Sequence, residues 1–196
     1  MIEYLAAATG LACVWLNARL QVWGWVIGLV SVGLYAWIFW QARLYADAAL
    51  QGVFAASSVY GLWAWRRGGP GIARQAITQG TQAEWALLAL LAMVATLVGG
   101  YGLSRYTDHP RPWLDAALTA GSLVAQYQLA HKRLENWLLW LGLDAIYVGL
   151  YLEQGLYPTA ALFTCYLGLA AWAYRAWKSE LTSATAGMRA STGRSG

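Results

Sequence analysis

Charged residues are scarce in this chain of 196 residues. Asp, Glu, Lys and Arg make up only 11% of it, and 59% of the residues are hydrophobic. Soluble domains carry about 25% charged residues. The mean hydropathy is +0.42, and the few charges gather between long apolar runs. This composition excludes an ordinary soluble domain and indicates an integral protein of the lipid bilayer.

Residues that hold metals or attack substrates are equally rare. The two cysteines, Cys13 and Cys165, lie in separate apolar runs without CxxC spacing, so we expect two buried apolar thiols. The two histidines, His109 and His131, lie far apart in sequence, and no GxSxG or HExxH motif occurs. We therefore expect no metal, no cofactor and no catalytic residue.

Seven apolar runs are long enough, or nearly so, to cross the ~30 Å hydrocarbon layer as helices. Tryptophan marks the ends of many of them, as in the aromatic belts found at headgroup depth. No basic residue precedes the first run, which we therefore expect to be a helix of the mature protein, not a cleaved signal. The runs are Ile2–Leu16, Val22–Gln41, Leu44–Trp65, Trp85–Leu103, Trp113–Ala130, Trp137–Leu152 and Tyr157–Trp177.

The basic residues predict the orientation of these spans. With seven spans, ten Lys and Arg residues fall on the C-terminal side of the membrane and three on the N-terminal side. Because basic loops stay in the cytoplasm, we expect a periplasmic N-terminus and a cytoplasmic C-terminus in a bacterial inner membrane. The same asymmetry explains the basic isoelectric point without a nucleic-acid partner.

The chain contains its own duplicate at a shift of 112 positions. Trp25 aligns with Trp137, Tyr35 with Tyr147 and Trp65 with Trp177, and the clearest block is Leu44–Leu50 over Leu156–Leu162. Four spans separate the matched helices, so both copies have the same orientation. This is a parallel repeat, as in the SWEET sugar transporters, and such proteins bind substrate where their halves meet.

We therefore predict an all-α membrane protein of seven helices in a 3+1+3 parallel-repeat, SWEET-like arrangement. Residues 1–65 form the first three-helix bundle, and residues 113–178 form the second. Residues 66–112 hold linker helix Trp85–Leu103 with its flanking loops. Residues 179–196, rich in Ser, Thr, Gly and Ala, are expected to be a disordered cytoplasmic tail.

Three of the predicted helices carry polar or aromatic side chains at positions i, i+4, i+7 and i+11, which mark one helix face. Polar groups in hydrocarbon must face the protein interior or a cavity. Three such faces therefore predict a shared polar cavity. The series are Asp47, Gln51, Phe54 and Ser58; Asp115, Thr119, Ser122 and Gln126; and Trp140, Asp144, Tyr147 and Tyr151.

Asp144 is the sharpest candidate among them. It lies seven positions into its helix, roughly 10 Å below the interface at 1.5 Å per residue. A carboxylate among aromatic rings suits a flat organic cation, because the rings offer cation–π attraction and the acid compensates the charge. Two other roles stay open: a hydrogen bond to a neighbouring helix, and coupling to protons.

Two segments carry a family resemblance: Glu135–Trp140, with its WxxW spacing, and Leu44–Gln51, followed by Tyr60–Trp65. In these segments the chain resembles the PnuC family of bacterial vitamin-precursor transporters, over most of its length. The resemblance implies a trimeric, SWEET-like carrier that works by facilitated diffusion, with a separate cytoplasmic kinase trapping the small-molecule vitamin. Carried over by position, the site would include Gln51, Trp137, Trp140 and Asp144.

The stripes and the resemblance together give ten candidate substrate-binding residues: Gln51, Ser58, Ser122, Gln126, Asn136, Trp137, Trp140, Asp144, Tyr147 and Tyr151. Nicotinamide riboside carriers tend to have Asn where this chain has Asp144, and the run Asp144–Tyr151 resembles thiamine-type relatives more closely. Both vitamins are flat aromatic cations, so both stay open, with nicotinamide riboside first.

Three other classes remain as alternatives. A SWEET-like sugar carrier would explain the repeat but not an intramembrane acid. A membrane-embedded enzyme needs a nucleophile–base pair or a metal cluster at depth, and the sequence offers neither. An assembly protein would leave the inward polar faces unexplained.

Overall fold

The computed structural model describes residues 2–41, 45–67 and 77–192, and all the regular structure in these ranges is helical. Seven helices follow the seven apolar runs, so the predicted all-α, seven-helix fold is confirmed. They are α1 (Ile2–Ala18), α2 (Trp23–Gln41), α3 (Tyr45–Arg67), α4 (Gln82–Tyr106), α5 (Pro112–Ala130), α6 (Asn136–Glu153) and α7 (Tyr157–Thr192).

The outer surface of the bundle is apolar. Helices α2 and α4 are long and apolar enough to cross a membrane by length and composition alone. On α4, a whole face of large apolar side chains is exposed, which in water would be an unusually large apolar patch and which hydrocarbon would solvate. This face comprises Leu87, Leu90, Leu91, Met93, Val94, Leu97 and Val98.

The repeat seen in the sequence is present in the backbone. Leu20, after α1, and Lys132, after α5, lie 112 positions apart, and both have positive φ, 57° and 52°. Equivalent turn hydrogen bonds surround them: Gln21 N to Leu16 O and Arg133 N to Gln128 O both measure 2.9 Å. The duplicate therefore includes α1 and α5 as well as the aligned helices α2, α3, α6 and α7.

The side-chain packing is duplicated too. Trp25 and Trp65 meet edge-to-face with ring centroids 5.5 Å apart, and their equivalents Trp137 and Trp177 do so at 5.4 Å. Such pairs contribute about 0.5–1.5 kcal/mol beyond area burial. Their identity between the two halves is explained by this shared packing.

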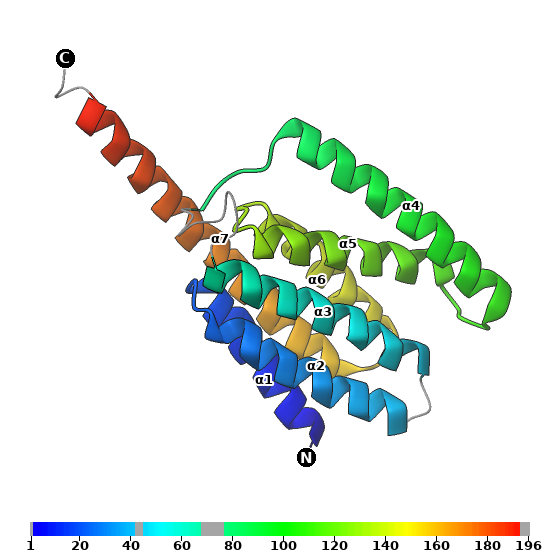
Figure 1. Cartoon of the computed structure of the whole chain (residues 1–196). Coiled ribbons are helices and arrows are strands. Elements are labelled where there is room, and N and C mark those ends of the chain that lie inside the picture. The colour runs from blue at the N-terminus through cyan, green and yellow to red at the C-terminus, as the bar shows by residue number, and fades with distance from the viewer. Residues whose placement is uncertain (1, 42–44, 68–76, 193–196) are drawn as a thin grey trace.

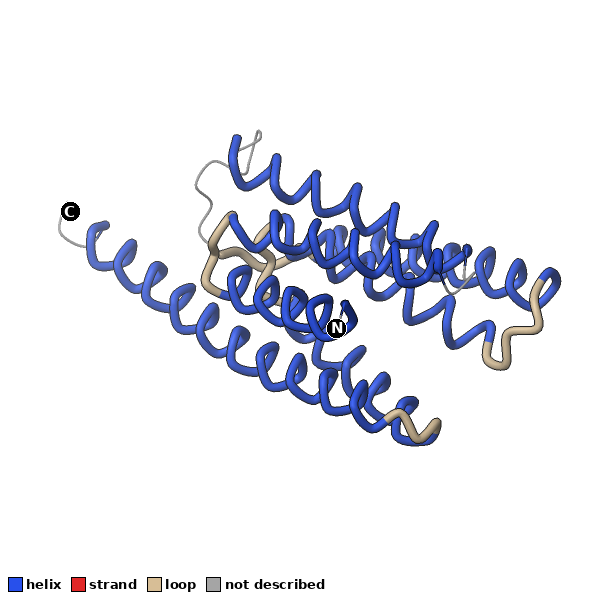
Figure 2. The backbone as a smooth tube through the Cα atoms, turned by 90° about the horizontal axis from the view of Figure 1, so that it is seen from below, coloured by secondary structure: helices blue, strands red, loops and turns tan. Residues whose placement is uncertain are grey.

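The two three-helix units meet through α1 against α7 and α3 against α5, which are equivalent contacts under the repeat. Helix α4 packs on α5 at the outside of the bundle (Figure 1). The described loops lie at the two ends of the bundle (Figure 2). This arrangement leaves the interior to α1–α3 and α5–α7.

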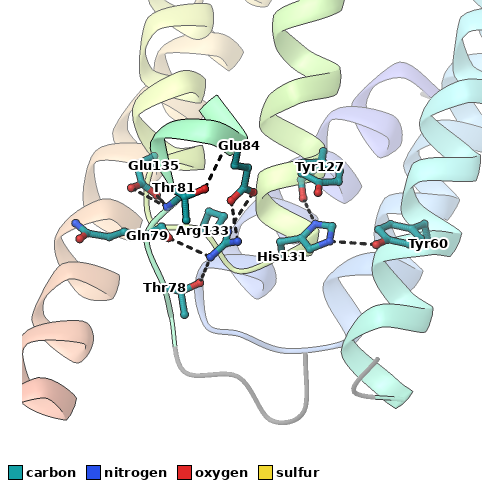
Figure 3. A network of polar contacts seen from close by, with 10 residues as sticks. Tyr60, Thr78, Gln79, Thr81, Glu84, Tyr127, His131, Arg133 and Glu135 are labelled. Carbon is teal, nitrogen blue, oxygen red and sulfur yellow. Dashed lines mark hydrogen bonds and ion pairs between the residues drawn. The ribbon is translucent and has the colours of Figure 1, made fainter. Parts of the chain in front are cut away.

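Polar contacts attach the start of α4 to the α5–α6 loop (Figure 3). Arg133 forms an ion pair of 2.7 Å with Glu84 and donates at 2.9 Å to the Thr78 hydroxyl. The Gly80 amide donates to the Glu135 carboxylate, and Thr81 caps α4 by accepting from the Glu84 amide at 3.2 Å. The linker helix is therefore fixed to the second half of the protein.

Two expectations from the sequence were wrong. Helix α7 continues to Thr192 and extends beyond the other helices (Figure 1), so residues 179–192 are helical instead of disordered. Residues 193–196 lie outside the described part. Helix continuation fits the Ala, Leu, Met and Arg content of this segment.

The second wrong expectation was that both cysteines are buried. Cys165 is exposed on the outer surface, where an apolar thiol can face hydrocarbon, and Cys13 is only partly buried.

Candidate functional site

A cavity of about 440 Å³ lies between the two halves. Among the described residues, six helices contribute to its lining, and α4 contributes none. Its volume is in the range of small-molecule binding sites. The linker thus lies outside the candidate site, which is built from the repeated helices.

The three predicted faces converge on this cavity. Every residue of the three series lines it except Asp47, whose side chain lies outside the described part of the chain. Nine of the ten candidate site residues are among the lining residues: Gln51, Ser58, Ser122, Gln126, Trp137, Trp140, Asp144, Tyr147 and Tyr151.

Asn136 is the exception. It is fully buried at the start of α6 and donates a 2.6 Å hydrogen bond to the carbonyl oxygen of Arg133, outside the cavity lining. The residue before the WxxW tryptophan therefore closes the α5–α6 turn. The prediction that Asn136 faces the substrate, based on its place next to Trp137, was therefore not matched by the cavity lining.

Asp144 lies on the α6 side of the cavity and is only 5% exposed. Within the described residues it forms no hydrogen bond or ion pair with another side chain. None of the described residues that line the cavity is Lys, Arg or His. A buried carboxylate without a partner is costly, and a cation entering this cavity would find its charge compensated there.

Aromatic rings cover the cavity beside Asp144. Tyr147 stacks on Tyr151 with centroids 6.0 Å apart, and Phe163 of α7 lies 4.9 Å from Tyr147 and 5.1 Å from Tyr151. Phe163 in turn meets Tyr166 edge-to-face at 5.6 Å. These four side chains form a continuous aromatic wall across α6 and α7.

The two tryptophans of the WxxW motif have different surroundings. Trp137 is 1% exposed and packs against Trp177, as Trp25 packs against Trp65 in the first half. Trp140 lines the cavity and is partly exposed. Packing therefore accounts for Trp137, whereas Trp140 is the tryptophan with accessible surface at the cavity.

Sequence reasoning missed the contributions of α1, α2 and α7. These helices supply mainly small, apolar or aromatic side chains, whose type does not distinguish a cavity from lipid. Asn17 and Ser31 are polar but belong to none of the three predicted series. The repeat contained a signal for several of them. The α2 residues 112 positions before Trp140, Asp144 and Tyr151 all line the cavity. The missed residues include Gly10, Cys13, Asn17, Gly28, Ser31, Val32, Phe39, Phe163, Tyr166 and Ala170.

A membrane-embedded helical protein whose repeated halves enclose a polar, aromatic cavity is a transporter for a small solute. Residues 1–179 match the sequence model of the nicotinamide mononucleotide transporter family, and the chain belongs to that family. It is a transporter and not an enzyme.

Several known proteins are similar along most of the chain. The nicotinamide riboside transporter PnuC of Escherichia coli is 26% identical over 210 residues, covering 90% of this chain and 84% of PnuC. The riboflavin/roseoflavin transporter RibM of Streptomyces davaonensis is 29% identical, covering 86% and 80%. The crystal structure of the vitamin B3 transporter PnuC has a TM-score of 0.75 at 23% identity, over 93% of this chain and 82% of that one. This structural likeness shows the shared fold.

Proposed function

We propose that this protein carries a flat, cationic, unphosphorylated vitamin precursor across the bacterial inner membrane by facilitated diffusion. Nicotinamide riboside is the first candidate and thiamine the second. The observation that carries the proposal is the unpaired, buried carboxylate of Asp144 in a cavity whose described lining includes aromatic rings and no cationic side chain.

The charge of the cavity discriminates among possible ligands. A mononucleotide carries a phosphate dianion, which would meet Asp144 and Asp115 without a compensating Lys or Arg in the described lining. Like charges at close range in a desolvated site are strongly unfavourable. The unphosphorylated riboside keeps the pyridinium cation and lacks the phosphate, so it fits this cavity better than the nucleotide does.

Thiamine is kept as the second candidate because its thiazolium is also a permanent flat cation. Riboflavin, the ligand in the name of a relative, is a neutral ring system. The aromatic wall would stack on it, but Asp144 would gain no opposite charge. The proposal therefore ranks riboflavin third.

Trapping by a separate kinase follows from the same electrostatics. Phosphorylation converts the cationic ligand into a molecule with a net negative charge. That product would be rejected by the cavity that admitted its precursor, so downhill entry needs no energy source in the carrier itself.

We further propose that the C-terminus is cytoplasmic. The ends of α1, α3 and α5 meet near the middle of α7. Trp177 donates to Ala18, Trp65 donates to Ala130, and these residues pack in one apolar cluster. Arg19, Lys132 and Lys178 lie at this end, and a basic end of the bundle is expected on the cytoplasmic side. A cytoplasmic reporter fused after Gly196 should be active, and activity of a periplasmic reporter there would refute this orientation.

Asp144→Asn tests the proposal directly. It removes the charge and keeps the shape, so affinity for the cation should fall about tenfold or more, since charge-assisted contacts are about twice as strong as neutral ones. Titration of purified protein with nicotinamide riboside, thiamine, riboflavin and nicotinamide mononucleotide gives the measurement, and Asp108→Asn in an exposed loop is the control.

The outcomes separate the possible roles of Asp144. A stable Asp144→Asn protein that binds the cations undiminished refutes charge compensation. Undiminished binding together with lost sensitivity to a pH gradient would indicate proton coupling instead. Early melting with normal affinity of the folded fraction would indicate a structural role.

A further inference from the structure

The cavity lining is organised in pairs related by the repeat. Nine pairs of residues that lie 112 positions apart both line the cavity. The two halves thus present equivalent positions to the same space. The pairs are Gly10 and Ser122, Val14 and Gln126, Asn17 and Leu129, Gly28 and Trp140, Val32 and Asp144, Phe39 and Tyr151, Gln51 and Phe163, Phe54 and Tyr166, and Ser58 and Ala170.

Helix α2 carries an uncharged copy of the α6 face. Trp140, Asp144 and Tyr151 line the cavity at positions i, i+4 and i+11 of α6. Their equivalents on α2, at the same spacing, are Gly28, Val32 and Phe39. Val32 therefore occupies the position in the first half that Asp144 occupies in the second.

The other pairs show where polar and apolar groups gather. Polar members lie mainly on α3, α5 and α6, which are contiguous, as in Gln51, Ser122 and Gln126. Their equivalents Phe163, Gly10 and Val14 lie on α7 and α1; α1 contacts both α7 and α2. The cavity thus has a polar, acidic side and an opposite side of small, apolar and aromatic groups.

We propose that Val32 is a specificity-determining residue, which keeps the α2 side of the cavity uncharged and holds the uncharged part of the ligand against α2. This inference rests on the proposed function. A carboxylate at both equivalent positions would create like-charge repulsion in the empty cavity. Asp115 of α5, the other carboxylate in the described lining, lies on the same polar side as Asp144. With Val32 present, a positive charge held against α2 would be desolvated without a partner there, which is strongly unfavourable.

The equivalence of the two positions has a testable consequence. If they face the same space, moving the carboxylate from α6 to α2 relocates the cation site and does not destroy it. The relevant quantity is the cation preference, defined as the affinity for a cationic ligand divided by the affinity for its neutral isostere. Suitable pairs are nicotinamide riboside with its dihydro form, and thiamine with its deaza analogue.

The experiment compares four purified proteins by titration with both ligand pairs. The wild type should prefer the cation about tenfold. Asp144→Val should reduce the preference to about one. The relocated variant Val32→Asp/Asp144→Val should recover a preference of about fivefold, whereas the control Val14→Asp/Asp144→Val should not, although its total charge is identical.

A folded Val32→Asp/Asp144→Val protein with a preference near one, or equal recovery by the Val14 control, overturns the inference. Absence of cation preference in the wild type refutes the proposed function instead, so the two failures are distinguishable. If the relocated variant does not fold, Val32→Asp alone is titrated with methyl viologen, a flat dication. Affinity should rise about fivefold over wild type, and no rise overturns the inference.

Discussion

The indole Nε1 of Trp65 donates a 3.0 Å hydrogen bond to the backbone carbonyl of Ala130, the last residue of α5. The equivalent bond, of 2.7 Å, joins Trp177 to Ala18, the last residue of α1. Each bond crosses from one half of the protein to the other. Both lie in the apolar cluster that borders the cavity at Leu129, Trp137 and Ala170. Because transport requires the halves to move relative to each other, we expect these reciprocal bonds to stabilise the arrangement seen here.

Trp177→Phe should lower the stability of the protein. Phe keeps most of the ring packing but leaves the buried carbonyl of Ala18 without its donor, a loss of about 1–3 kcal/mol. Thermal unfolding in detergent measures the effect. Trp172→Phe is the control, since Trp172 lies on the same helix with 41% of its surface exposed. Equal melting temperatures for both variants would contradict a stabilising role for the Trp177 bond.

Replacing the two motif tryptophans by alanine should separate binding from packing. Trp140→Ala removes accessible aromatic surface from the cavity, and cation–π attraction of about 0.5–2 kcal/mol corresponds to a weakening of ligand affinity from about twofold to about thirtyfold. Trp137→Ala should cost about 3–5 kcal/mol of stability, because it removes a buried side chain packed against Trp177 and leaves a void. The measurements are ligand titration and thermal unfolding of both variants. The assignment fails if Trp137→Ala melts normally and Trp140→Ala binds normally.

The fold was predictable because the apolar runs, the interfacial tryptophans and the repeat all point to the same architecture. Sequence could not separate Trp137 from Trp140, since both open the same helix within three residues. The repeat contains the missing information: Trp137 has an identical partner in Trp25, as packing requires, whereas Trp140 is matched by Gly28. For these two tryptophans, the one that differs from its repeat equivalent is therefore the better candidate for ligand contact.

The site was predictable only on its polar side. Gln51, Ser122 and Asp144 stand out because polar groups are costly in hydrocarbon. Gly10 and Phe163 do not stand out, since glycine and phenylalanine are equally at home against lipid. The tail was misjudged for a related reason: its small, polar composition resembles disorder, but it continues a helix already nucleated within α7, and propagation is easier than nucleation.

Arg133 and Glu84 should prove energetically coupled. Their side chains are 22% and 14% exposed, and Arg133 also donates to Thr78 and to the Gln79 carbonyl. Arg133→Met should cost about 1–3 kcal/mol, because the partly buried acceptors Glu84 and Thr78 lose a charged donor. A double-mutant cycle with Glu84→Gln, followed by thermal unfolding, measures the coupling.

The chain offers a matched control for this ion pair. Arg111 and Glu153 form a pair of 2.8 Å whose side chains are 52% and 63% exposed. Exposed pairs contribute about 0–1 kcal/mol, so Arg111→Met should change stability little. Similar losses for the two arginines would show that the α4 attachment is no stronger than a surface contact.

Gly10 and Tyr166 should show compensating substitutions. A Cβ atom on Gly10 would collide with the Tyr166 hydroxyl across the α1–α7 contact, and both residues line the cavity. At the equivalent contact between α5 and α3, Ser122 has a side chain where Gly10 has none, and Phe54 lacks the hydroxyl that Tyr166 carries. Gly10→Ser should therefore destabilise the protein by about 1–3 kcal/mol through overpacking. Gly10→Ser/Tyr166→Phe recreates the Ser and Phe combination and should regain much of that loss, giving a coupling of about 0.5–3 kcal/mol in a double-mutant cycle.

Melting temperatures of the wild type, the two single variants and the double variant measure the coupling between Gly10 and Tyr166, and ligand titration shows whether the cavity keeps its shape. Strictly additive effects of the two substitutions would mean that Gly10 is small for a reason other than the Tyr166 hydroxyl.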